Sequence, residues 1–296
     1  MDNYKNKTLT GAGSALAAFS LWGVIPIYFK AVSHVPSFEI LAHRVVWTVF
    51  FLGVLITLKG SRSNVCAVFR NKKLLVTLLL SSLLISTNWL VFIWAVAHDQ
   101  VLEASLGYFT TPIVSVALGM LFLRERLRTW QWFAIGLSVL GVSNLILSHG
   151  AIPWVAIGVS ITFGLYGLVR KIAEVDAFSG LFVETVLIVL PMLAYLLFIG
   201  LNGTGGYGPS DLKLTGLLMM AGLVTATPLV LFAVAAKRLK LSTLGFFQYI
   251  TPTGQFLLAV FLYNEPFTDV HKITFGMIWL ALTIYSFDSL TAHRRK

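Results

Sequence analysis

Long apolar runs separated by short polar segments organise this chain of 296 residues from one end to the other. A helix needs about 20 consecutive apolar residues to cross the hydrocarbon core of a membrane. Runs of that length recur ten times and predict ten membrane-spanning helices. The predicted spans are 10–29, 38–58, 74–97, 104–123, 130–148, 153–169, 178–199, 213–236, 241–263 and 272–290.

The composition agrees with an all-α integral membrane protein. Hydrophobic residues make up 57% of the chain and charged residues 11%, whereas a soluble domain has about 45–50% apolar and about 25% charged residues. A chain in lipid needs apolar side chains on its outer surface as well as in its interior. We therefore expect a multi-pass protein in a membrane of the bacterial inner type, with lipid around it.

The net charge of +10 is distributed in a way that predicts topology. With ten spans, both termini lie on one side, and the segments on that side hold eighteen of the 22 Lys and Arg residues. The opposite side holds Lys30, Lys213 and Lys272, and Arg44 lies within a span. Cytoplasmic loops carry such an excess of positive charge. Both termini are therefore predicted to be cytoplasmic, and no nucleic-acid partner is needed to explain the charge.

The second half of the chain resembles the first at an offset of about 140 residues. Three matches share that offset: Pro112 with Pro252, Glu125 with Glu265, and Gly136 with Gly276. We interpret residues 1–150 and 151–296 as two repeats of five spans each. Because five is odd, the second repeat is inverted relative to the first, which is a common construction of secondary transporters.

Two prolines lie within spans at corresponding places. Pro112 cannot bond to the carbonyl of Tyr108, and Pro252 cannot bond to that of Gln248, because proline lacks the N–H group. The paired positions favour two hinges, or two bends that face a cavity. A packing kink, common in membrane helices, is the alternative for each proline.

Polar side chains near these bends are candidates for lining a substrate pathway. Asn and Gln within a span either line a cavity or hydrogen-bond neighbouring helices together. Tyr and Trp near the ends of spans also serve as anchors at the membrane interface. The candidates are Asn88, Trp89, Tyr108, Gln248 and Tyr249.

Ionisable residues within spans are costly in lipid and mark pathways by default. Arg44 and Glu184 are each six residues into a predicted span, so both are candidate pathway residues. From their depths we expect no direct ion pair between them. Arg44 is instead expected to pair with a carboxylate such as Glu103, or to offer its fork to an anionic substrate group. Glu184, Glu39 and His43 are candidate proton-carrying groups, with a solvated position at the outer face as the alternative for the last two.

Several other chemistries lack support in the sequence. The one cysteine, Cys66, forms no intrachain disulfide, and neither a metal-ligand spacing nor a phosphate-binding glycine loop is present. We therefore expect no metal and no cofactor. A pump driven by nucleotide hydrolysis is disfavoured because the chain has no nucleotide-binding motif.

At these residues the chain resembles RarD-type permeases of the EamA branch of the drug/metabolite transporter superfamily, over essentially its whole length. The resemblance implies ten helices in two inverted repeats and transport of metabolites or drug-like compounds. The stretches that carry it are Glu39–Arg44, Asn88–Trp94, Glu103–Phe109, Leu241–Tyr249 and Leu262–Pro266.

A secondary transporter that moves small metabolites or drug-like molecules by alternating access is therefore the preferred function. A membrane channel and a membrane-embedded enzyme are the alternatives, and no set of nucleophile, base and orienting group supports an enzyme. The sequence leaves open the substrate, the direction of transport, coupling to an ion gradient, and whether the protein is a monomer or a dimer.

The topology can be tested with a reporter enzyme that is active only outside the cytoplasm. Fused after Lys296 it should be silent, and inserted in Gly200–Pro209 it should be active, because the charge asymmetry places those sites on opposite sides. The opposite pair of signals would contradict both the ten-span topology and the inversion of the repeats.

Overall fold

The computed structural model describes residues 2–58, 60, 62–123, 128–149, 152–206, 208, 211–236, 238 and 247–294. Within these residues the chain forms helices and no strands. The described part of the chain contains nine helices long and apolar enough to cross a membrane. They are α1 (Asp2–Ala31), α2 (Ser37–Leu58), α4 (Lys72–Ala97), α5 (Val101–Leu123), α6 (Thr129–His149), α7 (Trp154–Ile172), α8 (Ala177–Leu201), α9 (Leu212–Ala236) and α12 (Asp269–Arg294).

The predicted span 241–263 is described from Phe247 onward. After a turn at Gln248 and Tyr249, the chain forms α11 (Ile250–Leu257), which continues as the π-helical segment η1 (Leu258–Leu262). Residues 241–246 of this predicted span lie outside the described residues. The described helices therefore confirm an all-α membrane protein.

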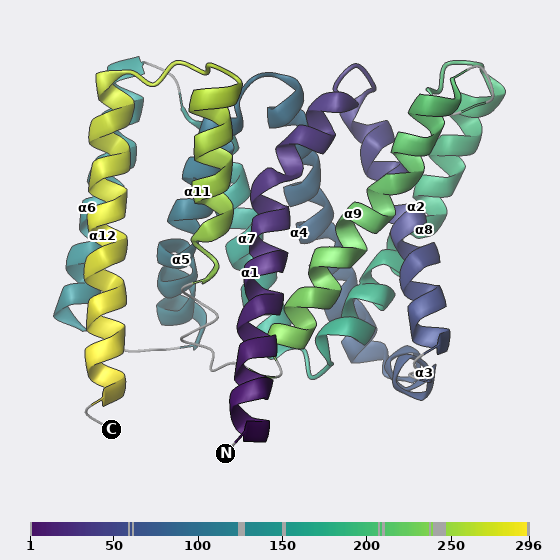
Figure 1. The fold of residues 1–296 in the computed structure, drawn as a ribbon, viewed down its shortest axis with the longest axis horizontal. Coiled ribbons are helices and arrows are strands. Elements are labelled where there is room, and N and C mark those ends of the chain that lie inside the picture. Colours follow the sequence, from purple (N-terminus) through teal and green to yellow (C-terminus); the bar gives the residue numbers. More distant parts are fainter. Residues whose placement is uncertain are drawn as a thin grey trace.

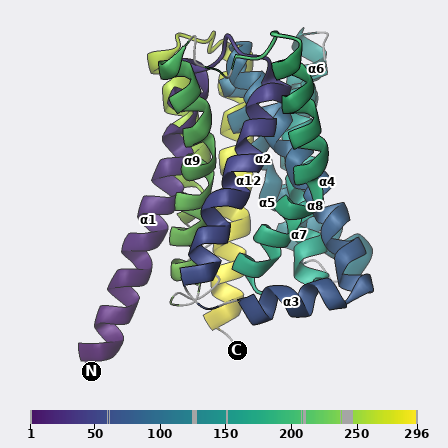
Figure 2. The ribbon, with the colours of Figure 1, turned by 90° about the vertical axis from the view of Figure 1, so that its right-hand side faces the viewer.

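The helices stand side by side in one bundle. The first residues of α1 and the last residues of α12 lie at the same end of it (Figure 1). The short helix α3 (Arg62–Arg70) lies across that same end (Figure 2). Its Val65 and Val68 are buried against the bundle while Cys66 is exposed. The sequence predicted only a basic loop here, because nine residues are too few to show a membrane-spanning pattern.

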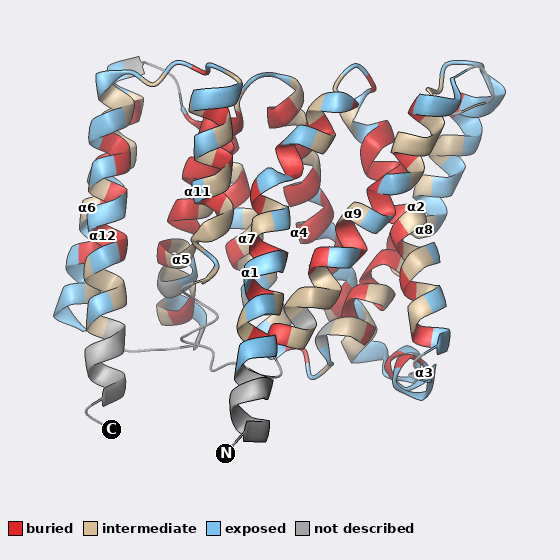
Figure 3. Cartoon of the chain, in the orientation of Figure 1, coloured by how far each residue is buried: buried red, intermediate tan, exposed pale blue. Residues whose placement is uncertain are grey.

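Burial follows the pattern expected in lipid. Buried residues face the spaces between helices, and exposed ones face outward (Figure 3). Large apolar side chains lie on the outer surface, including Leu147, which is 84% exposed, and Leu201, which is 88% exposed. Such a surface would be unfavourable in water and matches the acyl chains of lipid.

Helices α6 and α12 form an antiparallel pair at one edge of the bundle, joined to the remainder mainly through α5 (Figure 1). Polar side chains hold the pair together. The Asn144 amide donates to the Thr274 hydroxyl at 3.2 Å, and the Thr274 hydroxyl donates to the Gly141 carbonyl at 3.1 Å. Hydrogen bonds between helices help association where water offers no hydrophobic driving force.

Glycines allow the closest approaches between helices. A Cβ atom added at Gly222 of α9 would lie 2.6 Å from the backbone nitrogen of Thr48 on α2. A Cβ atom added at Gly107 of α5 would lie 2.7 Å from the carbonyl oxygen of Ala156 on α7. Small residues at membrane helix interfaces let backbones meet in this way. Since backbone atoms cannot move aside cheaply, neither position has room for a side chain.

We predict that Gly222→Ala lowers the free energy of unfolding by about 1–3 kcal/mol, because overpacking forces α2 and α9 apart. Gly216→Ala is the matched control on the same helix, since no described atom lies within 4 Å of a Cβ atom at Gly216. Thermal unfolding of the purified variants in detergent measures both effects. A melting temperature of Gly222→Ala equal to that of the control would contradict the close α2–α9 contact.

Candidate functional site

Arg44 of α2 is a buried charged residue in the interior of the bundle. It is two turns from the N-terminus of its helix, about 10 Å along the axis at 1.5 Å per residue. Its side chain is 4% exposed, and its Nε atom has no hydrogen-bond partner among the described residues. Arg44 forms no ion pair with a carboxylate in the described part of the chain. A buried cation in this state is unusual in a membrane protein.

Aromatic rings from two other helices enclose the Arg44 guanidinium group. Its central carbon lies 4.1 Å from the ring centroid of Trp89 on α4 and 5.5 Å from that of Phe29 on α1. Tyr28 and Tyr108 are also close enough to interact with it electrostatically. A ring face attracts a cation through its quadrupole, by about 2 kcal/mol or more when the pair is desolvated. The rings therefore offset part of the cost of burying the charge.

Asn88 holds three helices together next to this group. Its amide nitrogen donates to the Val159 carbonyl and to the Thr162 hydroxyl of α7, both at 3.0 Å. Its amide oxygen accepts from the Tyr108 hydroxyl of α5 at 3.1 Å. The side chain is 1% exposed. These contacts give Asn88 the helix-joining role that the sequence left as an alternative, and its partner Tyr108 also interacts electrostatically with Arg44.

Glu184 lies in a separate cluster on the side of the termini. Its fully buried carboxylate accepts hydrogen bonds from the Ser81 hydroxyl of α4 at 2.6 Å and from the Tyr166 hydroxyl of α7 at 3.5 Å. The guanidinium group of Arg170, also on α7, lies 3.5 Å away. Arg170 is thus the cation that balances Glu184. Arg44 and Glu184 do not meet, in agreement with their opposite depths.

Glu39 and His43 lie at the end of the bundle opposite the termini. The Glu39 carboxylate accepts a hydrogen bond from the backbone N–H of Gly206 at 2.7 Å. The His43 ring lies 3.9 Å from the same carboxylate, and both side chains are almost fully buried. The alternative of a solvated surface position is therefore wrong for both residues. Glu39 fastens the α8–α9 connection to the start of α2.

Two further carboxylates bind the N-termini of neighbouring helices at this end. Glu103 accepts from the backbone N–H groups of Val155 at 2.8 Å and Ala156 at 3.3 Å, at the start of α7. Because that carboxylate is bound to α7, the predicted pairing of Glu103 with Arg44 is wrong. The first N–H groups of a helix have no partner within it, and the helix dipole attracts negative charge there.

Glu265, in the connection between α11 and α12, acts on α5 in the same way. Its carboxylate accepts from the backbone N–H groups of Val101 at 2.8 Å and Leu102 at 2.7 Å. Burial raises the pKa of Glu265 above its ordinary value, and the two backbone hydrogen bonds partly offset that effect. Sequence reasoning missed this role, because nothing in the chain pairs residue 265 with residue 101.

The remaining candidates lie nearer the termini, away from Arg44. Gln248 is exposed, and Tyr249 lines a cavity of about 480 Å³ between α5, α11 and α12, together with Phe109, Trp279 and others. Pro112 lies inside α5, whereas Pro252 lies in the first turn of α11, just after the turn at Gln248 and Tyr249. The first-turn N–H group has no acceptor in any helix. The break at the start of α11 therefore precedes Pro252, and the two prolines are not equivalent.

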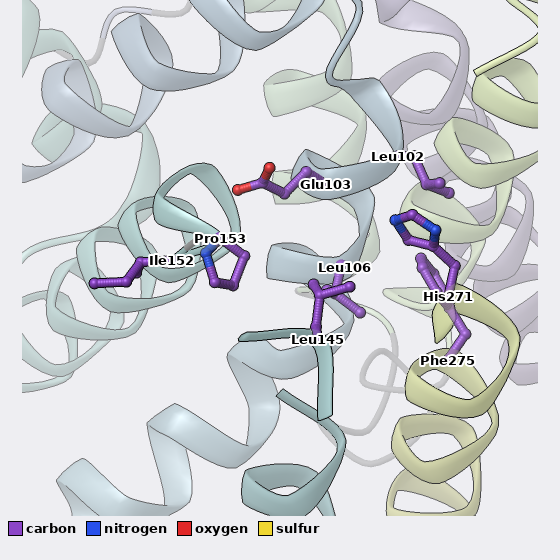
Figure 4. Close-up of a pocket in the computed structure, with 8 residues that line it drawn as sticks. All are labelled: Leu102, Glu103, Leu106, Leu145, Ile152, Pro153, His271 and Phe275. Atoms are coloured by element: carbon purple, nitrogen blue, oxygen red, sulfur yellow. The ribbon is translucent and has the colours of Figure 1, made fainter. Parts of the chain in front are cut away.

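A smaller cavity of about 160 Å³ lies between α5, α6 and α12 near the opposite end. Figure 4 shows Ile152 and Pro153 on one side of it, His271 and Phe275 on the other, and Glu103 between them. Apolar side chains form most of its wall. The Glu103 carboxylate is engaged with α7, so this cavity offers a ligand few free polar groups.

Sequence reasoning missed the partners of Glu184 as well. Tyr166 and Arg170 are four residues apart on α7, a spacing that places them on one helix face. That spacing was the available signal, but Arg170 was assigned to the cytoplasmic loop by its position after an apolar run. Within the described residues, no group of three or more His, Cys, Asp and Glu side chains could hold a metal ion.

Comparisons with known proteins agree with the helical architecture. Residues 9–147 match the model of the EamA-like transporter family. The chain is 46% identical to protein RarD of Salmonella typhi over 291 residues, covering 98% of this chain and 99% of that protein. The chain belongs to the RarD family of EamA-like transporters.

Other relatives support the membership of this RarD-family chain. An uncharacterized transporter of Vibrio cholerae is 47% identical over 278 residues, covering 94% of this chain and 92% of the relative. A crystal structure matches with a TM-score of 0.57 at 18% identity, covering 99% of each chain. That structural likeness shows a shared fold. The RarD-family chain is thus a multi-pass bacterial membrane transporter.

Exchange of charges can establish which arginine balances Glu184 in this RarD-family transporter. We predict that Glu184→Arg and Arg170→Glu each lower the melting temperature, because each leaves a buried charge without its partner. Combining the two should recover part of that loss. The exchange of Glu184 with Arg44 should recover none, since those residues do not meet. Thermal unfolding in detergent measures all variants, and recovery in the Arg44 exchange alone would contradict the assignment of Arg170.

Proposed function

We propose that this transporter moves small metabolites or drug-like compounds across the bacterial inner membrane by alternating access between two inverted five-helix repeats, residues 1–150 and 151–296. The observation that carries the proposal is that contacts between helices come in pairs. When each helix is replaced by its counterpart in the other repeat, one contact of a pair becomes the other. The substrate binds around Arg44, Trp89 and Tyr108 of the first repeat, next to Tyr28 and Asn88, which hydrogen-bond to the second repeat.

The paired contacts follow from numbering the spans within each repeat. If α1, α2, α4, α5 and α6 correspond to α7, α8, α9, α11 and α12, the α1–α11 contact exchanges with α7–α5. The α2–α9 contact exchanges with α8–α4, and α1–α9 exchanges with α7–α4. The α2–α8, α5–α11 and α6–α12 contacts each exchange with themselves. All of these contacts are present.

One of these exchanges holds at the level of single residues. A Cβ atom added at Gly23 of α1 would lie 3.5 Å from the Gly254 Cα atom of α11. A Cβ atom added at Gly164 of α7 would lie 2.9 Å from the Val114 side chain of α5. Gly23 and Gly164 are 141 residues apart, and Val114 and Gly254 are 140 apart. This agreement supports the repeat that the sequence suggested.

Inverted repeats give a physical basis for two access states. When each repeat adopts the conformation of the other, the opening moves to the opposite side of the membrane. The carboxylates of Glu39, Glu103 and Glu265 fasten connections at the end away from the termini. The larger cavity lies toward the termini, beside Tyr249. We therefore assign the described conformation to the state closed at the outer end.

The orientation follows from charge. The segments on the side of the termini hold most of the Lys and Arg residues, which favours a cytoplasmic location for both termini. In this orientation Glu39 and His43 lie near the outer face and Glu184 near the inner one. The proposal includes proton transfer by Glu39, His43 and Glu184, which would couple substrate transport to a proton gradient.

The proposed function is tested by uptake into proteoliposomes that contain the purified transporter. The substrates offered are amino acids, nucleosides and amphenicol drugs, each with and without a pH gradient. Saturable uptake that protein-free liposomes lack supports the proposal. Uptake that rises linearly with concentration without saturating would indicate a channel instead.

Pro112 offers a test of the alternating movement. We predict that Pro112→Ala slows saturable uptake at least about tenfold while the protein remains folded, because a continuous hydrogen-bond ladder stiffens α5. Pro191→Ala is the matched control, since Pro191 also lies inside a helix but is exposed on the surface of α8. Equal rates in the two variants would show that Pro112 serves packing alone.

A further inference from the structure

Arg44 carries a buried positive charge whose balance the described residues do not supply. The carboxylates on α2, α5 and α8 have other partners: Glu39 binds Gly206, Glu103 binds the start of α7, and Glu184 lies beside Arg170. No ion pair with Arg44 is present in the described ranges. The aromatic contacts reduce the cost of the charge but do not neutralise it.

An unbalanced cation in the membrane interior is destabilising, and an apolar residue of similar volume would avoid that cost. In the bound state an anion would balance it. We propose that Arg44 binds the carboxylate of the transported substrate, which makes the substrate a small organic monoanion. This inference rests on the proposed transport function and assigns a substrate class to the same site.

The Arg44 guanidinium group packs against two rings and keeps one buried N–H group without a hydrogen-bond partner among the described residues. The Arg44 central carbon lies 4.1 Å from the ring centroid of Trp89 and 5.5 Å from that of Phe29, so both rings pack against the planar group. The N–H bonds lie in the plane of the group and form a fork that matches the two oxygens of a carboxylate. The Nε–H group, which has no partner among the described residues, is available as one arm of that fork.

The neighbouring hydroxyl groups leave Arg44 as the principal donor. The Tyr28 hydroxyl donates to the Leu217 carbonyl at 2.8 Å, and the Tyr108 hydroxyl donates to Asn88 at 3.1 Å. Each hydroxyl has one hydrogen to donate. A carboxylate at this place therefore takes its hydrogen bonds from Arg44.

The charge at the site also discriminates among compounds that contain an anionic group. A single guanidinium group balances one negative charge. A zwitterionic amino acid would bring an ammonium group, for which the site offers no carboxylate among the described residues, and a phosphate monoester would bring up to two negative charges. A monocarboxylate is thus preferred over both, and an uncharged amide of the same shape is disfavoured.

The test measures binding to the purified, full-length transporter by the rise in melting temperature that a ligand causes. Benzoate is the main probe, and acetate is a second, non-aromatic carboxylate. Benzamide, phenylalanine and phenyl phosphate present the uncharged, zwitterionic and phosphate forms. We expect stabilisation by the carboxylates, with benzamide binding at least about tenfold more weakly than benzoate. A lack of stabilisation by both carboxylates, or equal stabilisation by benzamide, overturns the proposal.

Variants locate the binding at Arg44. Arg44→Gln should weaken benzoate binding at least about tenfold, and Arg44→Lys should weaken it less, because the charge stays while the fork is lost. Arg128→Gln is the control: it removes a partly exposed arginine that pairs with Asp288, far from α2 in the sequence. Equal benzoate binding by Arg44→Gln and Arg128→Gln overturns the proposal.

The stability of the unliganded variants separates binding from a structural role. Removing an unbalanced buried charge should leave the melting temperature of Arg44→Gln unchanged or higher, whereas loss of a structural contact would lower it. A lower melting temperature without ligand counts against the proposal. Uptake of neutral compounds alone would leave the transport function standing and refute the carboxylate site. Binding of benzoate without uptake of any compound would refute transport and keep the site.

Discussion

The interior of a membrane supplies no water, so every polar group on a spanning helix needs a partner within the protein. Several buried side chains meet this requirement by forming clusters of hydrogen bonds between helices. Asn88 satisfies three partners on α5 and α7, and Glu184 is bound by Ser81, Tyr166 and Arg170. Each cluster joins three helices, so the polar side chains determine which helices are neighbours as well as being buried themselves.

The same requirement acts at the ends of the helices. The start of a helix has N–H groups without internal acceptors, and in this protein carboxylates from other helices or connections provide them for α5 and α7. A short side chain of the same helix would cap its terminus equally well without joining it to another element. By using Glu103 and Glu265, the protein connects α5, α7 and the α11–α12 connection into one unit. Any movement that opens this end must release or carry these contacts together.

Arg44 is an exception, and under the proposed function it is the group that binds the substrate. Its charge is surrounded by rings and hydroxyl groups, and no described carboxylate balances it. A transporter needs such an incomplete site, because a substrate binds only where the protein alone leaves an interaction unmade. Glu184 shows the contrast, since its charge already has Arg170 as a partner within the protein.

Apolar runs of span length were enough to predict the helices, and the described helices agree with them closely. Such runs can be read from neighbouring residues alone, and they are conspicuous because a helix in lipid needs about 20 consecutive apolar residues. The sequence also indicated Arg44 and Glu184, since charges within apolar runs are conspicuous. Only the tertiary structure showed that Glu184 pairs with Arg170, that Glu103 caps α7 rather than meeting Arg44, and that Glu265 caps α5. These contacts join residues on different helices, and their partners depend on helix rotation and depth. Helix packing sets both quantities, and the apolar pattern of a membrane helix, which is similar on all its faces, does not encode them.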